Sequence, residues 1–515
     1  MKVGIIGNGI IGLSIAEKLL KQAGQRIELT IFGKKVRPSG CASTAAAAML
    51  NLWGEIESDI LKNPVTRARF EFSRQSQPLW STVITDLEEE SGLKIHYGNG
   101  THIIHNSDSP AQHDNFKAII DGLKEYNEPY STVLPADLSI TIPYYNPAPE
   151  KKARAAIHIP SESWVNPNHL LNALETIIDR FPNAKRIDAE CSKLNISAGN
   201  ICGITLENNE QIDLDVVVVC NGASFTTLVK KSEINHLFQR VFFGVGGSIV
   251  FKSGSKTLKH CVRTPSRGLA CGMYTVPYDA EHIIMGATNF VSHNPKDLRL
   301  NNIYQLIKQA QEEFNIDCWK SIHTRTNMGW RPISTDTLPM IGSTSIKGMF
   351  VATGTYRDGL FCSPIISSWL SDLILKGKSN LEEPLFAPER SLIAVYSREE
   401  AVNKYVEHNI NDPRINDGSQ DQIALAASLR DTSERLHDKV GAQEWGIPLL
   451  MHHMYEKGYI RPSSRHFCPP KIMTNLSNEG SYMPYGPLAS SQQSDFSFLE
   501  TNRLVSQTNS LSPSC

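Results

Sequence analysis

A glycine-rich turn near the start of this 515-residue chain has the spacing of a phosphate-binding loop. Gly7, Gly9 and Gly12 form the pattern G-x-G-x-x-G between a strand-like stretch at residues 2–6 and a helix-like stretch from residue 13. In such a loop the first glycine allows a tight turn, the second lets the backbone approach a pyrophosphate, and the third lets the helix pack closely on the strand. The helix N-terminus offers free N–H groups to the phosphates. We therefore predict a dinucleotide site here rather than a glycine-rich turn of another α/β fold.

The end of the next predicted strand, at residues 27–32, lacks the residue that usually completes such a site. An Asp or Glu just past this strand normally holds the ribose hydroxyls of the dinucleotide. Here that position is Gly33, and Lys34 and Lys35 follow it. We expect backbone groups or water to replace the missing carboxylate.

Length and composition exclude several classes of protein. A chain of 515 residues is too long for one compact core, so two or three domains are expected. The formal net charge is −2, with both signs mixed along the chain, which does not suit a nucleic-acid-binding protein. No apolar stretch reaches membrane-spanning length, and the glycine-interrupted N-terminus has no signal-peptide cleavage site.

The ten cysteines are scattered and form no C-x-x-C pair. We interpret them as reduced thiols of a cytoplasmic protein and predict neither disulfides nor a zinc site. The His452–His453 pair also has no further ligand at a useful spacing, so no metal site is predicted.

Further stretches predict the elements that must position a bound dinucleotide. Four consecutive valines at 216–219 predict a fully buried parallel strand, which would bring Asn221 and Gly222 to the carboxyl edge of a sheet. Apolar, β-rich stretches at 242–251, 271–277 and 282–288 predict a separate antiparallel sheet. Residues 95–104 predict a hairpin with a Gly-Asn-Gly turn, and helices are expected at 303–314, 365–375, 397–408 and 421–440.

Five stretches together resemble the flavin-dependent amino-acid oxidases of the D-amino-acid oxidase type, and glycine oxidase most among them. The resemblance covers roughly residues 1–378 and is most specific in the last two stretches. The five are residues 7–12 (GNGIIG), the alanine-rich block at 43–50, the valine strand and turn at 216–223, residues 329–332 (GWRP) with the D-x-L-P-x-I-G that follows, and residues 356–359 (YRDG).

The resemblance implies an α/β (α+β) fold with FAD rather than NAD as the cofactor. A Rossmann-like FAD-binding domain would consist of residues 1–85, 150–225 and 325–383, and a mainly antiparallel β-sheet substrate domain of residues 86–149 and 226–324. A helical C-terminal extension is expected at 384–467. The Ser-, Asn- and Gln-rich residues 468–515 are expected to be disordered.

The resemblance also implies that a tyrosine and two arginines face the substrate, and the matching residues are Tyr274, Arg331 and Arg357. The planar fork of Arg331 suits a carboxylate, and Tyr274 can donate a second hydrogen bond to it. Other roles stay open: Arg357 can serve the flavin, Tyr274 can simply pack in the sheet, and the alanine block can be a plain helix. The cofactor-binding residues implied are Gly7, Gly9, Ile10, Ile11, Gly12, Ser43, Thr44, Ala46, Ala47, Met49, Gly222, Arg331, Gly354, Tyr356, Arg357, Asp358, Gly359 and Leu360.

The expected activity is that of an FAD-dependent oxidase. It would take a hydride from the Cα of an amino acid or related amine and give an imine, then an oxo acid and ammonia, with molecular oxygen reduced to hydrogen peroxide. The alternatives are a flavin-dependent dehydrogenase that passes electrons to a quinone or carrier protein, and a non-catalytic flavoprotein that binds a partner. The exact substrate, its chirality and the oligomeric state, a homo-oligomer included, stay open.

Three departures from the family pattern favour a specialised substrate over glycine itself. Gly33 replaces the acidic ribose anchor, Thr355 stands where relatives often have His, and Ala48 stands where glycine oxidases often have Gly. The C-terminal extension also has no counterpart in the compact family members.

Overall fold

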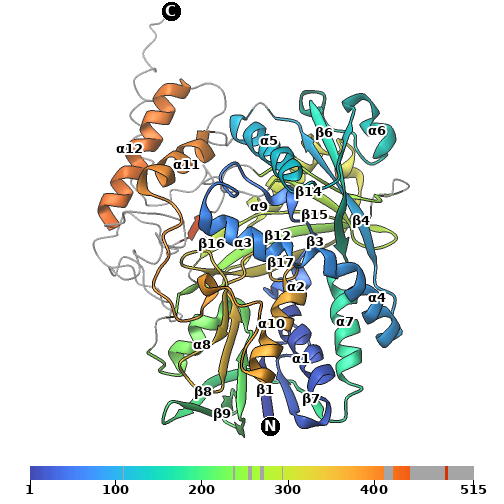
Figure 1. Ribbon diagram of the computed structural model, residues 1–515. Helices are drawn as coiled ribbons and strands as arrows, with labels where there is room; N and C mark the ends of the chain where they lie inside the picture. Colours follow the sequence, from blue (N-terminus) through green and yellow to red (C-terminus); the bar gives the residue numbers. More distant parts are fainter. Residues whose placement is uncertain are drawn as a thin grey trace, which may run out of the picture.

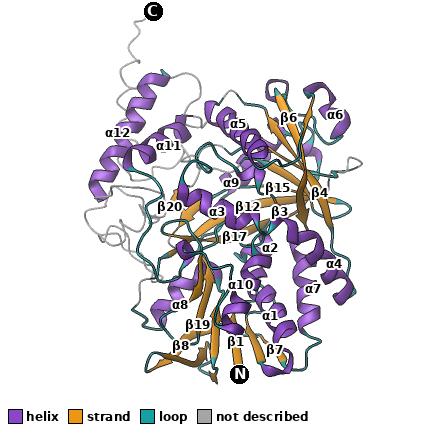
Figure 2. Ribbon diagram, viewed as in Figure 1, coloured by secondary structure: helices purple, strands orange, loops and turns teal. Residues whose placement is uncertain are grey.

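The computed structural model describes residues 1–107, 109–235, 238–252, 254, 258–266, 272–292, 294–410, 421–440 and 482–484. Cys271, the His452–His453 pair, and the parts of the predicted extension at 411–420 and 441–467 lie outside the described residues. So does the predicted disordered tail, apart from residues 482–484. The described residues form two large sheets, a small third sheet and helices packed on them, which confirms the mixed α/β fold class (Figures 1 and 2). The domain boundaries stay predictions.

The N-terminal stretch lies at the centre of a mostly parallel sheet with the order β18-β19-β11-β1-β2-β7. The first strand, β1, pairs in parallel with both β2 and β11, while β18 alone runs antiparallel to its neighbour. The valine strand β11 is buried throughout, as predicted. The strands are β1 (Lys2–Ile6), β2 (Glu28–Phe32), β7 (Ala184–Ile187), β11 (Val216–Val219), β18 (Met340–Ser343) and β19 (Met349–Thr353).

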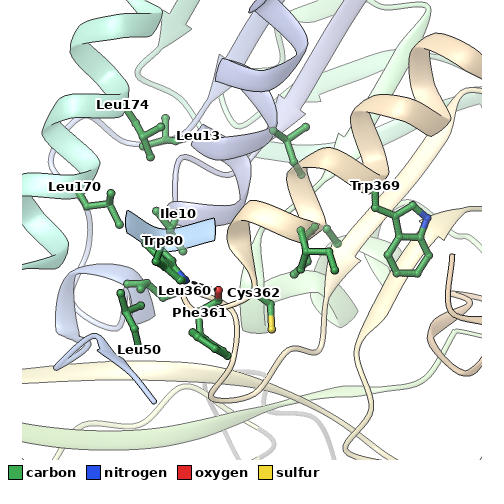
Figure 3. Packing of buried hydrophobic residues seen from close by; sticks show 14 of the residues in the cluster. Ile10, Leu13, Leu50, Trp80, Leu170, Leu174, Leu360, Phe361, Cys362 and Trp369 are labelled. Carbon is green, nitrogen blue, oxygen red and sulfur yellow. Dashed lines mark hydrogen bonds between the residues drawn. The ribbon is translucent and has the colours of Figure 1, made fainter. Parts of the chain in front are cut away.

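Helices α1 (Ile10–Ala23), α7 (Pro167–Ile178) and α10 (Ser363–Lys376) pack together against this sheet. Figure 3 shows apolar side chains from these helices meeting in one core, with Leu13 beside Leu174. Below them Trp80 donates its indole N–H to the carbonyl oxygen of Phe361 at 2.9 Å. This bond ties the loop before α10 to the N-terminal half of the chain. A small third sheet and helix α8 (Phe225–Lys231) share an apolar cluster with the mostly parallel sheet. The strands of the small sheet are β8 (Cys191–Ser197), β9 (Asn200–Leu206) and β10 (Gln211–Asp213).

The second large sheet has the order β20-β16-β12-β15-β14-β13-β4-β6-β3, with β17 also paired to β12 and β5 to β6. Its pairings are antiparallel except for that of β13 with β4, so the predicted antiparallel sheet is confirmed. The strands are β3 (Met49–Leu50), β4 (Tyr97–His105), β5 (Ser131–Val133), β6 (Ala155–Val165), β12 (Val241–Lys252), β13 (Cys261–Arg263), β14 (Tyr274–Pro277), β15 (His282–Gly286), β16 (Phe290–Ser292), β17 (Ile322–Ser334) and β20 (Tyr482–Pro484).

The predicted hairpin at residues 95–104 is wrong. Strand β4 continues straight through the Gly-Asn-Gly sequence, between β6 on one side and β13 on the other. The pairing with β6 shifts between Asn99 and Thr101. The glycines therefore form a bulge, which absorbs the irregularity without reversing the chain.

The predicted helices at the C-terminal side are present as α11 (Arg398–Ile410) and α12 (Gln422–Val440), which pack against each other at one side of the molecule (Figure 1). Lys404 of α11 lies 3.0 Å from a carboxylate oxygen of Asp59, and Asn63 donates to the carbonyl of Val395 at 2.7 Å. The described extension is thus attached to residues 59–63.

The other helices are α2 (Ala42–Ala45), α3 (Pro64–Arg74), α4 (Trp80–Ser91), α5 (Pro110–Glu125), α6 (Leu138–Thr141) and α9 (Leu300–Glu313). None of the helices in the described ranges is both long and apolar enough to cross a bilayer.

Candidate functional site

A cavity of about 460 Å³ lies between the two large sheets. It begins at the carboxyl ends of β1, β2 and β11 and extends to β12, β14 and β17. Residues from every stretch of the family resemblance line it. Of the predicted site residues, those that line the cavity are Gly7, Gly9, Ile10, Ile11, Ser43, Ala46, Ala47, Met49, Gly222, Tyr274, Arg331, Tyr356, Arg357, Asp358, Gly359 and Leu360. Gly12, Thr44 and Gly354 do not line it.

The three glycines of the N-terminal turn differ in what surrounds them. Gly7 has φ +113°, and a Cβ there would lie 2.5 Å from the carbonyl oxygen of Cys220. A Cβ on Gly12 would overlap the carbonyl oxygen of Gly7, so Gly12 allows the close packing of α1. A Cβ on Gly9 would meet only the hydroxyl of Ser43, at 3.0 Å. Gly9 therefore borders open space within the cavity, where the spacing predicts a pyrophosphate.

The missing acidic residue at Gly33 has a steric explanation. A Cβ at Gly33 would lie 2.6 Å from the side-chain carbon Cγ of Asn8. Asn8 is held in place because its amide donates to the carbonyl of Lys34 at 2.8 Å. The Asn8 side chain thus occupies the space beside this position. A different carboxylate, that of Glu207, also lines the cavity, and its Oε2 lies 3.5 Å from the ammonium nitrogen of Lys34.

The alanine-rich block is helical for only one turn. Helix α2 ends at Ala45, and Ala46 continues in an extended conformation towards β3. Ala48 adopts a left-handed conformation with φ +51°, which non-glycine residues rarely take. A glycine would adopt this conformation without strain. The plain alanine helix is therefore wrong beyond Ala45, and the block lines the cavity.

Arg331 lies on β17 and extends into the cavity. Its Nη1 donates to the carbonyl oxygen of Thr288 at 3.2 Å and to the side-chain oxygen of Asn289 at 2.9 Å. Asn289, in turn, donates to the hydroxyl of Tyr356 at 2.6 Å. Both bonds of Arg331 use Nη1, so among the described residues Nη2 and Nε have no hydrogen-bond partner. The guanidinium is thus held at one nitrogen and offers the rest of its fork to a bound anion.

Tyr274 lies on β14, three strands away from Arg331 across β15 and β12. It is 6% exposed and lines the same cavity. Two glycines make room for the two side chains. A Cβ on Gly286 would lie 2.5 Å from the Tyr274 hydroxyl, and one on Gly246 would overlap the guanidinium of Arg331. The two polar groups therefore share a face on which the intervening sheet presents glycines.

Gly246 offers a test of this arrangement that changes no polar group. We expect Gly246→Ala to push the guanidinium out of position and to lower kcat/KM for a carboxylate substrate by about 100-fold, because small misplacements of a positioning group have such effects. Bound flavin should stay near one per chain. In an Arg331→Ala background the same change should have little further effect. Full additivity of the two substitutions would contradict the contact between Gly246 and Arg331.

Arg357 belongs to a charged cluster at the edge of the cavity. Its Nη1 lies 3.9 Å from Glu55, and Glu55 is also paired at 2.5 Å with Arg263, whose side chain is 1% exposed. Burial alone would raise the pKa of Glu55, but the adjacent Arg263 and Arg357 outweigh it and hold the pKa below its usual value. The guanidinium of Arg357 also stacks on Tyr356, at 4.7 Å from the ring centre. The structure thus gives Arg357 a carboxylate neighbour that Arg331 does not have among the described residues.

Asp358 is also paired with an arginine. Arg69 donates to one of its carboxylate oxygens through Nε at 3.0 Å and Nη2 at 2.6 Å. Beyond Arg357 and Asp358 a second hollow of about 190 Å³ begins, and Tyr396 and Lys404 from the C-terminal side help to line it. The described part of the extension therefore borders the arginine end of the site.

The residues present fit the dinucleotide that the resemblance implies. The glycine turn and the positive end of α1 suit the phosphates, and the open space at Gly9 is the kind of cradle that a side chain would fill. The alanine block and Met49 give the cavity an apolar wall suited to a ring system. Tyr274 and Arg331 line the same cavity as these residues.

Sequence reasoning missed several residues that shape the site. Glu55 and Asn289 gave no local signal, because their partners are distant in the chain. Gly246 and Gly286 had a usable one, since glycine within an apolar strand often marks the close approach of another group.

Comparison with protein families gives a match to the DAO model, described as FAD dependent oxidoreductase, over residues 2–373. Among curated proteins, the bifunctional protein ThiO/ThiG of Nostoc sp. is 32% identical over 115 residues, which are 21% of this chain and 16% of that protein. The chain thus spans less than a fifth of that relative's length. The glycine oxidase of Geobacillus kaustophilus is 23% identical over 392 residues, covering 76% of this chain and 97% of the relative.

The fold also resembles solved structures. The crystal structure of glycine oxidase from Bacillus cereus ATCC 14579 matches with a TM-score of 0.63 and 22% identity, over 76% of this chain and 99% of that one. The match thus includes nearly all of that structure and leaves about a quarter of this chain without a counterpart.

Proposed function

Because the chain belongs to the DAO family of FAD-dependent oxidoreductases, we propose that it oxidises the carbon–nitrogen bond of an amino acid or a related amine. The products would be an imine, which water converts to an oxo acid and ammonia, and hydrogen peroxide formed from oxygen. The observation that carries the proposal is Arg331, whose fork opens into the same cavity as the N-terminal glycine turn. FAD, when bound, supplies a two-electron acceptor.

We assign the carboxylate of the substrate to Arg331 and Tyr274. The free side of the Arg331 fork can form two charge-assisted hydrogen bonds with a carboxylate, and the Tyr274 hydroxyl can donate a third. The bond from Arg331 to Asn289 fixes the guanidinium before the substrate arrives. A substrate held at both carboxylate oxygens loses most of its rotational freedom, so that its Cα–H bond can be oriented towards the apolar wall of the cavity.

Glu55, the carboxylate paired with Arg357, is a poor candidate for a general base. Burial would raise its pKa, but the adjacent Arg263 and Arg357 hold that pKa below its usual value. A carboxylate stabilised in this way by a cation is a weak proton acceptor. We therefore propose that the substrate amine binds in its unprotonated form, and that the side chains of this site orient the substrate rather than remove a proton from it.

Arg357 is proposed to have a different task from Arg331. Its pairing with Glu55 and its stacking on Tyr356 keep it at the edge of the cavity, next to the hollow that Lys404 helps to line. A substrate with a second polar group could extend from Arg331 towards this edge. This arrangement supports a substrate larger than glycine.

An activity screen tests the proposed reaction. Purified yellow protein is mixed with glycine, sarcosine, D- and L-amino acids and small amines, and ammonia and peroxide are measured under air. We expect both products, in equal amounts, from at least one substrate that carries a carboxylate. Dye reduction under nitrogen without any peroxide under air would replace the oxidase with a dehydrogenase. The absence of both reactions would reject an amine substrate.

A further inference from the structure

Three histidines from distant parts of the chain meet on the second large sheet. His102 lies on β4, His158 on β6, and His260 directly before β13. His102 and His158 are opposite each other in the pairing of β4 with β6, and β13 pairs with the other side of β4. Each histidine offers one ring nitrogen, and these three nitrogens lie within 4.8 Å of one another. We call these residues the histidine triad.

The triad faces away from the cavity between the two large sheets. Side chains two residues apart on a strand share a face. His102 therefore shares a face with Ile104, and His260 with Val262, both of which belong to the apolar cluster that includes α9. On the other face, Cys261 packs with Tyr274 beside the cavity. The triad is thus separated from the proposed reaction site by the sheet itself.

The polar atoms of the triad have few other partners. His102 is 2% exposed, and neither of its ring nitrogens has a hydrogen-bond partner within the described structure. The Nε2 atom of His158 is buried and has none either. Leaving buried polar atoms without partners is unfavourable, so such a cluster needs an explanation. A bound cation would satisfy one nitrogen of each ring.

His260 already has the hydrogen bond that orients a metal ligand. Its Nδ1 lies 2.7 Å from the carbonyl oxygen of Asn99. A carbonyl can only accept, so Nδ1 carries the proton and Nε2 has a free lone pair. Metal-binding histidines commonly donate their other ring N–H to a carbonyl in this way. Gly100 also leaves room for the rings, since a Cβ there would lie 2.6 Å from both Nε2 of His158 and Nδ1 of His260.

The protonation state suits a ligand set as well. Burial, together with the neighbouring His158 and His260, lowers the pKa of His102 to about 3. Burial also lowers the pKa of His158, with His260 adding to the effect. Neutral imidazoles are the form that coordinates a metal.

We propose that the histidine triad binds a divalent transition-metal ion of the zinc type, with an open coordination position towards solvent. Nitrogens bound to one tetrahedral zinc lie about 3.4 Å apart, given a Zn–N distance of about 2.1 Å, so modest side-chain rotation closes the triad on the ion. His158 and His260 are only half-buried, which gives the ion a path of entry. The bound ion would connect β4, β6 and the residue before β13.

No local pattern in the sequence indicates this site, and the prediction of no metal site was based on sequence spacing alone. The histidines are 56 and 102 residues apart, and only the strand pairing brings them together.

Zinc titration of the full-length, tag-free, flavin-bound protein tests the proposal. After chelator treatment, calorimetry should show one saturable Zn²⁺ per chain, and no binding of Mg²⁺, which prefers oxygen ligands. His158→Gln and His260→Gln should each weaken Zn²⁺ binding by at least about 100-fold, since each removes one of three ligands.

His96→Gln serves as the matched control. His96 is half-buried like His158 and lies directly before β4, but its ring contacts Trp164 instead of the triad. Its replacement should leave Zn²⁺ affinity unchanged. Retained flavin absorbance and an unchanged circular dichroism spectrum identify the variants that fold. The proposal is wrong if the wild type shows no saturable site, or if both folded triad variants bind Zn²⁺ as tightly as the control.

Discussion

Replacing Arg331 with alanine should leave the protein yellow and abolish most of its activity on substrates that carry a carboxylate. Removing one partner of a desolvated, hydrogen-bonded charge pair costs about 2–5 kcal/mol, and each factor of ten corresponds to about 1.4 kcal/mol. We therefore expect kcat/KM to fall by about 1,000-fold. Flavin content should stay near one per chain, because the glycine turn that we assign to the phosphates lies at the other end of the cavity.

Two further measurements assign the loss to carboxylate binding. Arg331→Lys keeps the charge but not the fork, so its activity should fall between those of the wild type and Arg331→Ala. For an amine that lacks the carboxylate, Arg331→Ala and the wild type should differ by less than about threefold, since the missing bond affects neither.

Arg325→Ala is the matched control for the strand. Arg325 also lies on β17, but it stacks on Tyr278 outside the cavity, at 5.0 Å from the ring centre. It should keep nearly full activity. If Arg331→Ala retained normal kcat/KM for every carboxylate substrate, the assignment of Arg331 to the substrate would be wrong.

The second large effect is expected at Gly9, where valine should abolish flavin retention. Gly9 has φ −77° and ψ −178°, which is extended backbone that any residue adopts. A Cβ there would meet only Ser43 within the protein, so the folded chain can accommodate it. The valine methyl groups would instead fill the space that we assign to the pyrophosphate. We expect less than about one tenth of the wild-type flavin content, because backbone N–H contacts to phosphate require close approach.

Measuring the ratio of flavin to protein after purification, with thermal unfolding in parallel, separates lost binding from lost folding. Ser14→Val places the same side chain on α1 outside the cavity lining and should keep the wild-type ratio. Gly7→Ala should differ from Gly9→Val, because φ +113° and the nearby Cys220 carbonyl make it destabilising to the fold itself. Normal flavin content in Gly9→Val would argue against a pyrophosphate at this turn.

Local patterns in the sequence were sufficient to predict the elements that depend on local order. Residues 2–23 form a strand, a loop and a helix as predicted, because the pattern of apolar residues and glycines that specifies them is local in the chain. The four valines of β11 could be assigned because a strand buried on both faces is apolar at every position.

Features that depend on contacts between distant residues could not be predicted in this way. The hairpin at 95–104 was wrong because β6 and β13 hold β4 straight through its glycines. The sequence shows that Gly33 replaces an acidic residue, but the reason, that the Asn8 side chain occupies the adjacent space, is apparent only in the fold. The histidine triad and the pairing of Glu55 with Arg263 likewise join residues that no local pattern relates.

The most direct test of the proposed function is an anaerobic titration of the flavin. The purified wild-type protein is mixed under nitrogen with each member of a panel of amino acids and amines, and its visible flavin absorbance is followed. We predict that at least one amino acid bleaches the wild-type flavin completely, at one equivalent of substrate per flavin. Over the time that the wild-type flavin needs to bleach, the same substrate should not bleach the flavin of Arg331→Ala. If no primary or secondary amine bleaches the wild-type flavin, the chain does not oxidise carbon–nitrogen bonds and the proposed function is wrong.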